Sequence, residues 1–237
     1  MTDSTPTNCD VAIIGGGPAG CAAGVFCARA DLDTVVVADG RSTLQKCAFV
    51  ENYLGFPAGI EPRLLLELAE RHAREAGCTM VDGSVTSATT GENGFVLALE
   101  EHSFVADRLL AASWSDSDYL DDLGVHTETE SAGSVSIVPT DGSGETNVDG
   151  VYAAGRLTET HHQALVNAGD GARVALEIIG ELDPEFYNDW IAPAGYYEQY
   201  DREIPVGVEE IDHAERRRRV ERSTEYMSSL FEQSKFE

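Results

Sequence analysis

The sequence VAIIGGGPAG, at residues 11–20, decides the fold. Four apolar residues lead into three glycines, Gly15, Gly17 and Gly20, and a further apolar run follows them. This pattern predicts a buried strand, a glycine turn and the start of a helix. The three glycines permit, in turn, a tight turn, a close backbone approach to a pyrophosphate, and close packing of the helix on the strand. The free N–H groups and positive end of the helix then face phosphate groups.

A second apolar strand supports the prediction of a dinucleotide site. Residues 34–38 (TVVVA) are mostly β-branched, and they end at Asp39. An acid about twenty residues beyond the glycines accepts hydrogen bonds from a ribose 2′-hydroxyl, and it repels a 2′-phosphate. Strand, spacing and acid together favour a bound dinucleotide over a glycine-rich turn that has no ligand.

The chain is strongly acidic. Its 237 residues include 42 acids and 16 bases, a formal net charge of −26, and only Lys46 and Lys235 are lysines. Such a surface repels nucleic acid and anionic membranes, so we expect neither as a partner. Acid-rich, lysine-poor surfaces suit concentrated salt, which screens self-repulsion. We therefore expect a halophilic source and poor folding in low salt.

Three features of the sequence favour a cytoplasmic location. No apolar run is long enough to cross a bilayer, and the first eight residues lack the basic and apolar regions of a signal peptide. The cysteines are odd in number and widely spaced, which is typical of a reducing compartment. They are Cys9, Cys21, Cys27, Cys47 and Cys78. No CxxC pair occurs, so we expect neither a thioredoxin-type dithiol nor a zinc ribbon, and no metal site.

The rest of the chain predicts further elements. A long irregular loop at residues 40–56 is a candidate functional loop. The sequence pattern predicts helices at residues 61–76 and 209–231. Short strands are predicted at residues 79–81 and 84–86, a hairpin at 95–99 and 104–105, and a separate buried strand at 108–112.

Several motifs follow GGGPAG in a fixed order. They are VENYLGF at residues 50–56, GSV at 83–85, FV at 95–96, GVYAAG at 150–155, and the pairs QA, AG and GA between 163 and 172. In this order they resemble the FAD-binding domain of thioredoxin-reductase-like flavoproteins, in the pyridine nucleotide-disulphide oxidoreductase family. The resemblance covers roughly residues 10–180. It implies a three-layer, Rossmann-like α/β fold with a parallel sheet and a small antiparallel β-meander, and FAD as the cofactor.

The chain also departs from this family. The family inserts an NADPH-binding domain, which carries its redox CxxC, between the strand that matches residues 108–112 and the second glycine motif. Here only residues 113–134 remain at that place, and no second GxGxxG occurs. We therefore expect an FAD-binding domain at residues 1–180, assembled from family segments 9–120 and 128–180 without the NADPH domain. A helical, aromatic-rich extension follows at residues 181–237.

The resemblance implies a cofactor site in two halves. The first glycine turn and Asp39 take the ADP half, and Val85 meets the adenine through its backbone. Gly155 and Arg156 face the pyrophosphate and the ribityl chain. The last helix of the domain is expected at residues 162–179, and its start points at the flavin. The predicted cofactor-binding residues are Gly15, Gly17, Pro18, Ala19, Gly20, Asp39, Gly40, Arg41, Thr43, Leu44, Asn52, Val85, Ser113, Gly155, Arg156, His162, Gln163 and Ala164.

Two substitutions within the motifs bear on this site. Arg156 stands where the family has an aspartate, so an expected ribityl contact is lost or replaced. Trp114 stands where the family has a glycine. Its indole either stacks on a flavin or adenine ring or, as we prefer, fills the core.

Cys47 is the one catalytic candidate. It lies beside Lys46 in the loop that the family folds next to the flavin, where a thiol with a lowered pKa would react with flavin or substrate. A buried, unreactive thiol is the preferred alternative. The histidines 161 and 162 are either exposed polar residues or part of the site. The aromatic residues between 186 and 200 are expected to cover the flavin or a dimer surface. Arginines 216–219 are expected to form a solvated helix face.

These features lead to a functional hypothesis with two alternatives. The hypothesis is an FAD-dependent oxidoreductase that receives electrons from a partner protein of ferredoxin or thioredoxin type, or from transiently bound NAD(P)H. One alternative is a non-catalytic flavin-binding module, and the other is a thiazole-synthase-like protein with a single Rossmann unit, against which the VENYLGFP loop argues. The family's FAD domains commonly pair, so a homodimer is expected.

Overall fold

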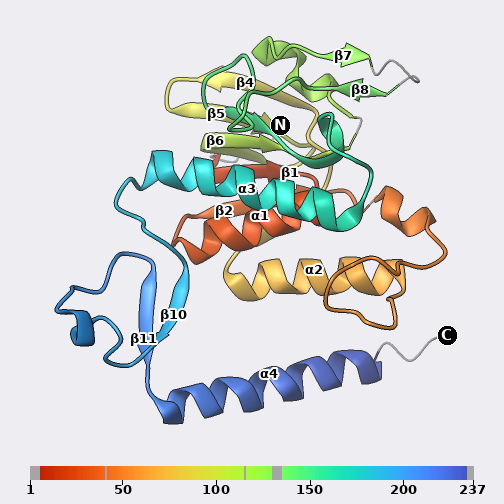
Figure 1. The fold of residues 1–237 in the computed structure, drawn as a ribbon. Helices are drawn as coiled ribbons and strands as arrows, with labels where there is room; N and C mark the ends of the chain where they lie inside the picture. Colours follow the sequence, from red (N-terminus) through yellow and green to blue (C-terminus); the bar gives the residue numbers. More distant parts are fainter. Residues whose placement is uncertain (1–5, 41, 115, 130–134, 234–237) are drawn as a thin grey trace. The chain divides into compact units, whose positions relative to one another are not determined.

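Figure 1 shows the computed structural model, which describes residues 6–40, 42–114, 116–129 and 135–233. The chain divides into two compact units, Met1–Leu182 and Asp183–Glu237. Among the described residues, no helix combines the length and the apolar character that crossing a membrane requires.

The first unit is built around β1 (Thr7–Ile14), which lies in the middle of a seven-stranded sheet. β1 pairs in parallel with β2 (Thr34–Ala38) on one side and with β6 (Ser103–Ala111) on the other. β3 (Thr79–Asp82) extends the sheet beyond β2. Residues 11–13 and 35–37 are at most 2% exposed. Long apolar runs of this kind are expected of parallel strands, because both faces of such strands are covered.

β6 serves two parts of the sheet. Its first half pairs antiparallel with β5 (Gly94–Ala98), which in turn pairs with β4 (Ser87–Gly91). Its second half pairs in parallel with β9 (Val151–Ala153). The predicted hairpin is confirmed, but the prediction of a separate strand at residues 108–112 is wrong. Asp107 and Arg108 mark only the change from an alternating pattern to a fully buried one within a single strand.

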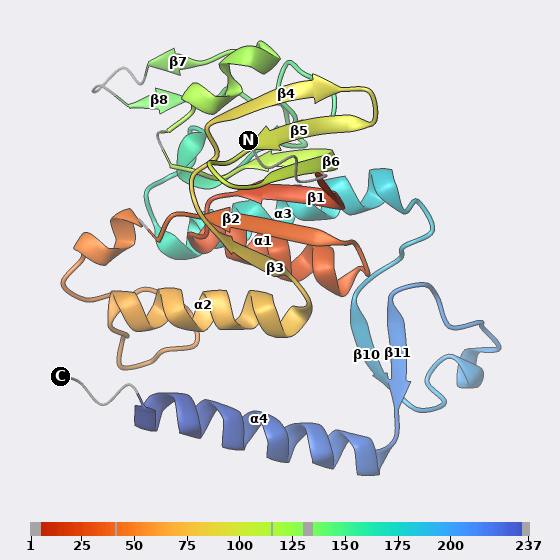
Figure 2. The ribbon, with the colours of Figure 1, turned by 180° about the vertical axis from the view of Figure 1, so that it is seen from behind.

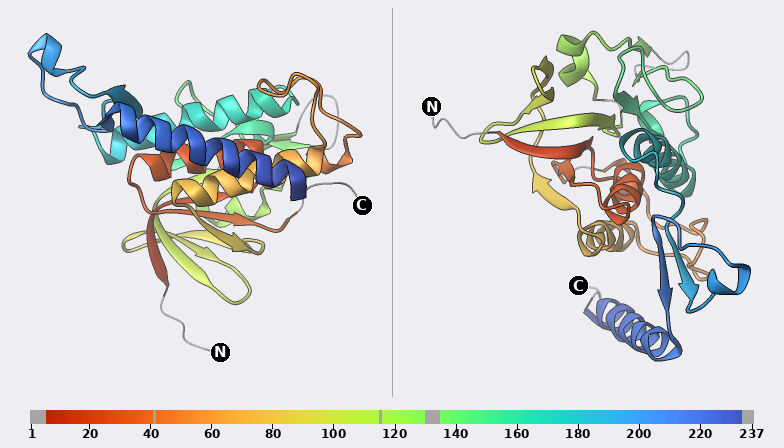
Figure 3. Two further views of the ribbon diagram at one scale, coloured as in Figure 1. Left: turned by 90° about the horizontal axis from the view of Figure 1, so that it is seen from below. Right: turned by 90° about the vertical axis from the view of Figure 1, so that its left-hand side faces the viewer.

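Three helices lie on one face of this sheet: α1 (Pro18–Arg29), α2 (Pro62–Ala76) and α3 (Ala164–Leu182) (Figures 2 and 3). The α2 boundaries follow from its sequence. The Glu61 carboxylate caps the helix by accepting from the Leu64 N–H at 2.8 Å, and Gly77 ends it in the left-handed conformation. The predicted Rossmann-like α/β fold is thus confirmed.

The connections are shorter elements. The loop after β2 contains one 3₁₀ turn, η1 (Thr43–Lys46). Residues 84–86, predicted as a strand, form an irregular link into β4. The β6–β9 connection holds η2 (Asp118–Leu123) and two two-residue strands, β7 (Glu128–Thr129) and β8 (Ser136–Ile137).

The second unit contains a parallel pair, β10 (Trp190–Pro193) and β11 (Val208–Ile211), followed by α4 (His213–Gln233). A 3₁₀ turn, η4 (Glu198–Tyr200), lies between the strands. The helix predicted from residue 209 starts at His213 instead, because residues 208–211 pair with β10. The crowded aromatic residues of this unit pack on one another, with the Trp190 and Tyr196 ring centroids 4.7 Å apart.

Candidate dinucleotide-binding site

The first glycine turn joins β1 to α1 at the carboxyl end of the sheet. Gly15 has φ +116°, and a Cβ there would lie 2.3 Å from the carbonyl oxygen of Ala112, which follows the neighbouring strand β6. A Cβ on Gly20 would lie 1.8 Å from the Gly15 oxygen. No side chain fits at either place, so the turn depends on glycine for steric reasons.

Gly17 differs from its neighbours because it faces open space. A Cβ there would meet no atom within 4 Å, and its φ of −80° is ordinary for any residue. Gly17 is also the N-cap of α1, where no side chain caps the helix and no acid occupies the first turn. The unpaired N–H groups and the helix dipole therefore favour an anion here, and the missing side chain leaves room for a pyrophosphate.

The second glycine turn follows β9 and forms η3 (Gly155–Leu157). Gly155 has φ +70°, and a Cβ there would lie 2.6 Å from the Ala19 Cβ. On α3, a Cβ on Gly171 would lie 2.1 Å from the Ala19 oxygen. The N-terminus of α1, the second turn and α3 therefore converge on Ala19. This brings together the two halves of the site that the sequence predicted 140 residues apart.

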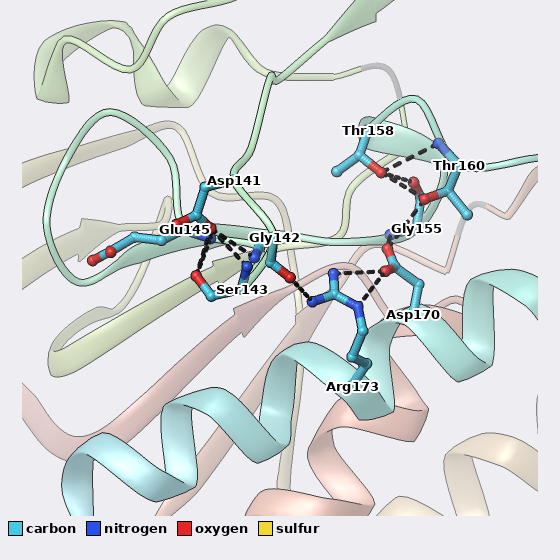
Figure 4. A network of polar contacts seen from close by, with 10 residues as sticks. Asp141, Gly142, Ser143, Glu145, Gly155, Thr158, Thr160, Asp170 and Arg173 are labelled. Atoms are coloured by element: carbon cyan, nitrogen blue, oxygen red, sulfur yellow. Dashed lines mark hydrogen bonds and ion pairs between the residues drawn. The ribbon is translucent and has the colours of Figure 1, made fainter.

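A polar network holds the second turn in place (Figure 4). The Gly155 N–H donates to Asp170 Oδ2 at 2.8 Å, and Thr160 Oγ1 donates to the same oxygen at 3.3 Å. Arg173 donates to Asp170 Oδ1 at 2.9 Å and to the Gly142 carbonyl at 2.8 Å. Asp170 was not among the site residues expected from the sequence. Its signal was an acid between two glycines (GDG) near the start of the helix.

Asn167 is a second missed residue. It lies one turn before Asp170 on α3, and its Cβ is 3.7 Å from the position of a Cβ on Gly155. Its amide oxygen Oδ1 is buried and accepts no hydrogen bond within the described part of the chain. A buried amide oxygen normally has a donor, so a ligand that brings one would fit this place.

Residues on the adenosine side meet at the ends of β2 and β3. The Ser84 hydroxyl donates to Asp39 Oδ2 at 3.3 Å, and Asp39 is exposed. Val85 follows as a half-buried residue, and Gly40 (φ +73°) faces open space. Thr43 and Leu44 lie half-buried in η1. The predicted binding residue Arg41 lies outside the described residues.

The loop after β2 reaches the start of α3. Asn52 Nδ2 donates to Gln163 Oε1 at 2.7 Å, which joins two predicted cofactor-binding residues that are 111 positions apart. A small apolar cluster of Val50, Ile60 and Leu65 packs the loop against α2. His162 and Gln163 are exposed and precede the helix, which begins at Ala164 rather than at residue 162.

Cys47 is exposed, so the preferred expectation of a buried thiol is wrong. Its N–H donates to the Leu44 carbonyl at 3.0 Å, a contact within its own loop, and Lys46 beside it is also exposed. The other four thiols are buried. Burial raises the pKa of Cys9, Cys21 and Cys27 to about 12 and that of Cys78 to about 11. Cys47 alone is placed for reaction.

Trp114 and Arg156 depart from expectation in opposite ways. Trp114 is 38% exposed, so the preferred expectation that it fills the core is wrong. Its φ of +62° keeps the left-handed backbone that favours glycine. Arg156 is only 8% exposed, which places its positive charge inside the protein beside the second turn. Ser113, between the two turns, donates through Oγ to the Asp116 carbonyl at 2.5 Å.

A cavity of about 430 Å³ opens at the opposite end of β1. Its lining includes Asp10, Asp33, Glu92 and Asp107. Four carboxylates would repel the phosphates of a dinucleotide. The carboxyl end of β1, where the two glycine turns converge, is therefore the better candidate for a dinucleotide, and we call this place the glycine crevice.

The arrangement defines a Rossmann-like dinucleotide-binding α/β protein. From β1 the chain moves outward to β2 and β3 on one side, and later adds β6 and β9 on the other. Sheets with such a switch in direction bind ligands at the carboxyl ends of the strands beside it, which here is the carboxyl end of β1. Both glycine turns lie at this end.

Comparison with known proteins agrees with this class. Residues 9–113 match the family model of pyridine nucleotide-disulphide oxidoreductases. Thioredoxin reductase of Chlamydia trachomatis is 30% identical over 114 residues, which are 45% of this chain and 36% of that protein. Thioredoxin reductase of Bacillus subtilis is 30% identical over 109 residues, 45% of this chain and 34% of that protein. The match spans about a third of the length of these relatives.

Solved structures share the fold over a longer stretch. A thioredoxin reductase from Gloeobacter violaceus aligns with a TM-score of 0.67 and 18% identity, covering 76% of this chain and 97% of that one. An oxidoreductase from Agrobacterium tumefaciens aligns with a TM-score of 0.67 and 16% identity, covering 76% and 100%. In sequence, the chain is thioredoxin-reductase-like over its first half, and the shared fold extends beyond that half.

Proposed function

We propose that this chain is an FAD-binding oxidoreductase of thioredoxin-reductase type that works without an NAD(P)H domain or redox dithiol of its own. Electrons come from a partner protein of ferredoxin or thioredoxin type, or from transiently bound NAD(P)H. The observation that carries the proposal is the convergence on Ala19. There the first glycine turn, the second glycine turn and α3 come within van der Waals contact of one helix N-terminus.

The residues of the crevice fit FAD. The α1 amides and the open face of Gly17 would hold the pyrophosphate, and Asp39 would accept hydrogen bonds from a ribose. The amide oxygen of Asn167, buried without a donor, supports a ligand that reaches the second turn as well as the first. When bound, FAD supplies the redox chemistry, while the protein supplies orientation and electrostatics.

The absorption spectrum of protein purified in molar salt tests the cofactor. A yellow protein with a flavin spectrum supports the proposal. A protein that stays colourless after soaking with FAD contradicts it. Bound adenylated thiazole, detected by mass spectrometry, would favour the thiazole-synthase-like alternative.

Mixing experiments test the oxidoreductase activity. NADH, NADPH and reduced ferredoxin are each mixed rapidly with the flavin-loaded protein, and bleaching of the flavin band is followed. Bleaching by any of the three supports an oxidoreductase and identifies the donor class. If none bleaches the flavin, the chain is a non-catalytic flavin-binding module. We also propose that the protein is a homodimer and that it is cytoplasmic. Sedimentation in the same salt tests the homodimer.

A further inference from the structure

We propose that Trp114 is a stacking surface for one of the flat rings of the bound dinucleotide. The inference rests on the proposed function, because it needs a dinucleotide in the glycine crevice. Trp114 follows β6, whose last residue Ala111 pairs with Ile14 on one side and Ala153 on the other. Trp114 therefore follows the carboxyl end of β6, the strand between those that lead into the first and second glycine turns.

The backbone of Trp114 is held in an unfavourable conformation. A φ of +62° brings the Cβ of a non-glycine residue close to the following carbonyl oxygen, and bulky residues rarely adopt it. The segment is fixed by Ser113, whose Oγ donates to the Asp116 carbonyl at 2.5 Å and lies 2.8 Å from the hydroxyl of buried Tyr119. Strain that the surroundings impose in this way is concentrated at ligand sites.

The protein leaves part of the indole uncovered. It is 38% exposed, and within the described residues no other aromatic ring packs on it. The second tryptophan of the chain, Trp190, instead packs edge-on against Tyr196 with centroids 4.7 Å apart. A large apolar ring that is strained, exposed and next to a ligand crevice is explained if a ligand covers it.

The charge of the protein favours this kind of contact. A formal net charge of −26 opposes an anionic ligand, and concentrated salt would weaken attraction between phosphates and cations. Stacking of a neutral indole on a neutral ring is affected by neither. Adenine and the flavin ring system are both flat and aromatic, so they share the chemistry that the indole recognises.

Three substitutions at this position separate the ring from the backbone strain. Trp114→Ala removes the ring and keeps a strained Cβ, Trp114→Gly removes both, and Trp114→Phe keeps an aromatic ring. We expect FAD affinity, measured by titration in molar salt, to fall about tenfold in the alanine and glycine variants and to change less than about threefold in the phenylalanine variant. The glycine variant should unfold no earlier than the wild type, because glycine adopts this φ freely.

ADP and FMN distinguish the two rings. A loss of ADP affinity in Trp114→Ala identifies adenine as the stacked ring, and a loss of FMN affinity alone identifies the flavin. Either result supports the inference. Wild-type FAD affinity in both the alanine and glycine variants overturns it and leaves the proposed function intact. Failure of the wild-type protein to bind FAD overturns the proposed function instead.

Discussion

The two glycine turns reach the same helix N-terminus by different means. In the first turn, backbone packs on backbone: a Cβ on Gly15 or Gly20 would overlap the Ala112 or Gly15 oxygen. In the second turn, the Gly155 N–H donates to the carboxylate of Asp170. Arg173 donates to the same carboxylate and to the Gly142 carbonyl. The first turn is a local steric arrangement, whereas the second depends on a side-chain network that spans residues 142–173.

This difference predicts how each turn fails. A steric turn fails when volume is added, and a network fails when one charged group is removed. Removing a charged group should therefore loosen the second turn while the first keeps its shape. Adding a side chain in the first turn should instead disrupt the whole β1–α1 unit.

The largest effect is expected from Gly20→Ala. Its Cβ would lie 1.8 Å from the Gly15 backbone oxygen, which cannot move without breaking the first turn. We expect the free energy of unfolding in molar salt, measured with denaturant, to fall by about 3 kcal/mol or more. The matched control is Gly17→Ala, which faces open space. It should change stability by less than about 1 kcal/mol, but weaken FAD binding. Wild-type stability in Gly20→Ala would show that the turn is not sterically fixed.

A smaller effect is expected from Asp170→Ala. This change leaves the Gly155 N–H without its acceptor, and the Asp170 side chain is only 14% exposed. The Thr160 hydroxyl keeps the Thr158 oxygen at 2.8 Å as an acceptor. We expect a loss of about 1–3 kcal/mol in unfolding free energy, together with weaker FAD binding. Arg173→Ala removes the exposed partner only and should cost less than about 1 kcal/mol. Equal losses in the two variants would mean that the ion pair, not the Gly155 contact, holds the turn.

Acid should loosen the outer end of the same network. The Ser143 hydroxyl and the backbone N–H groups of residues 143–145 donate to Asp141, and these bonds lower the pKa of that carboxyl below 3.8. A lowered folded-state pKa gives stability that is complete above the unfolded-state pKa and is lost as pH falls through the folded-state pKa. We expect Asp141→Asn to flatten part of the acid limb of the stability–pH curve below about pH 4. An unchanged acid limb would contradict this role.

The smallest effect on stability, but a clear readout, comes from the thiols. In the first turn, Cys21 donates to the Gly16 carbonyl at 3.3 Å, and burial raises its pKa to about 12. Cys47 is exposed. An aromatic disulfide reagent at about pH 8 should therefore label one thiol in the native protein and five after denaturation. Rapid labelling of Cys47→Ser would contradict this expectation, because it would mean that one of the four buried thiols becomes exposed.

The sequence predicted what local chemistry decides. The strand–turn–helix at residues 11–20 follows from steric needs of adjacent glycines, and α2 follows from its own cap residues. Pairing partners decided the parts that were wrong. β6 continues past residue 107 because β1 pairs with it on both sides of that residue, and residues 208–211 form a strand because β10 lies beside them.

The candidate site divides in the same way. The roles of the glycines and Asp39 could be predicted from the sequence because these roles depend on the spacing of the residues. Those of Asp170 and Asn167 could not, because these two residues act on the second glycine turn, which lies outside their own helix; the Gly155 N–H is 15 residues before Asp170. The exposure of Cys47 and Trp114 depends on what the folded chain places over them, which no short motif records.

The way β6 and β9 lie side by side has a consequence for the modular design of this protein. The chain leaves the sheet after Ala111 and re-enters at Val151, which pairs with Leu109 only two residues earlier on the adjacent strand. Because both ends of this connection are anchored to neighbouring strands, doubling its length raises the closure entropy by only about 0.6 kcal/mol. This connection is therefore a suitable insertion site for a reporter or a second catalytic module, because the sheet would keep its register.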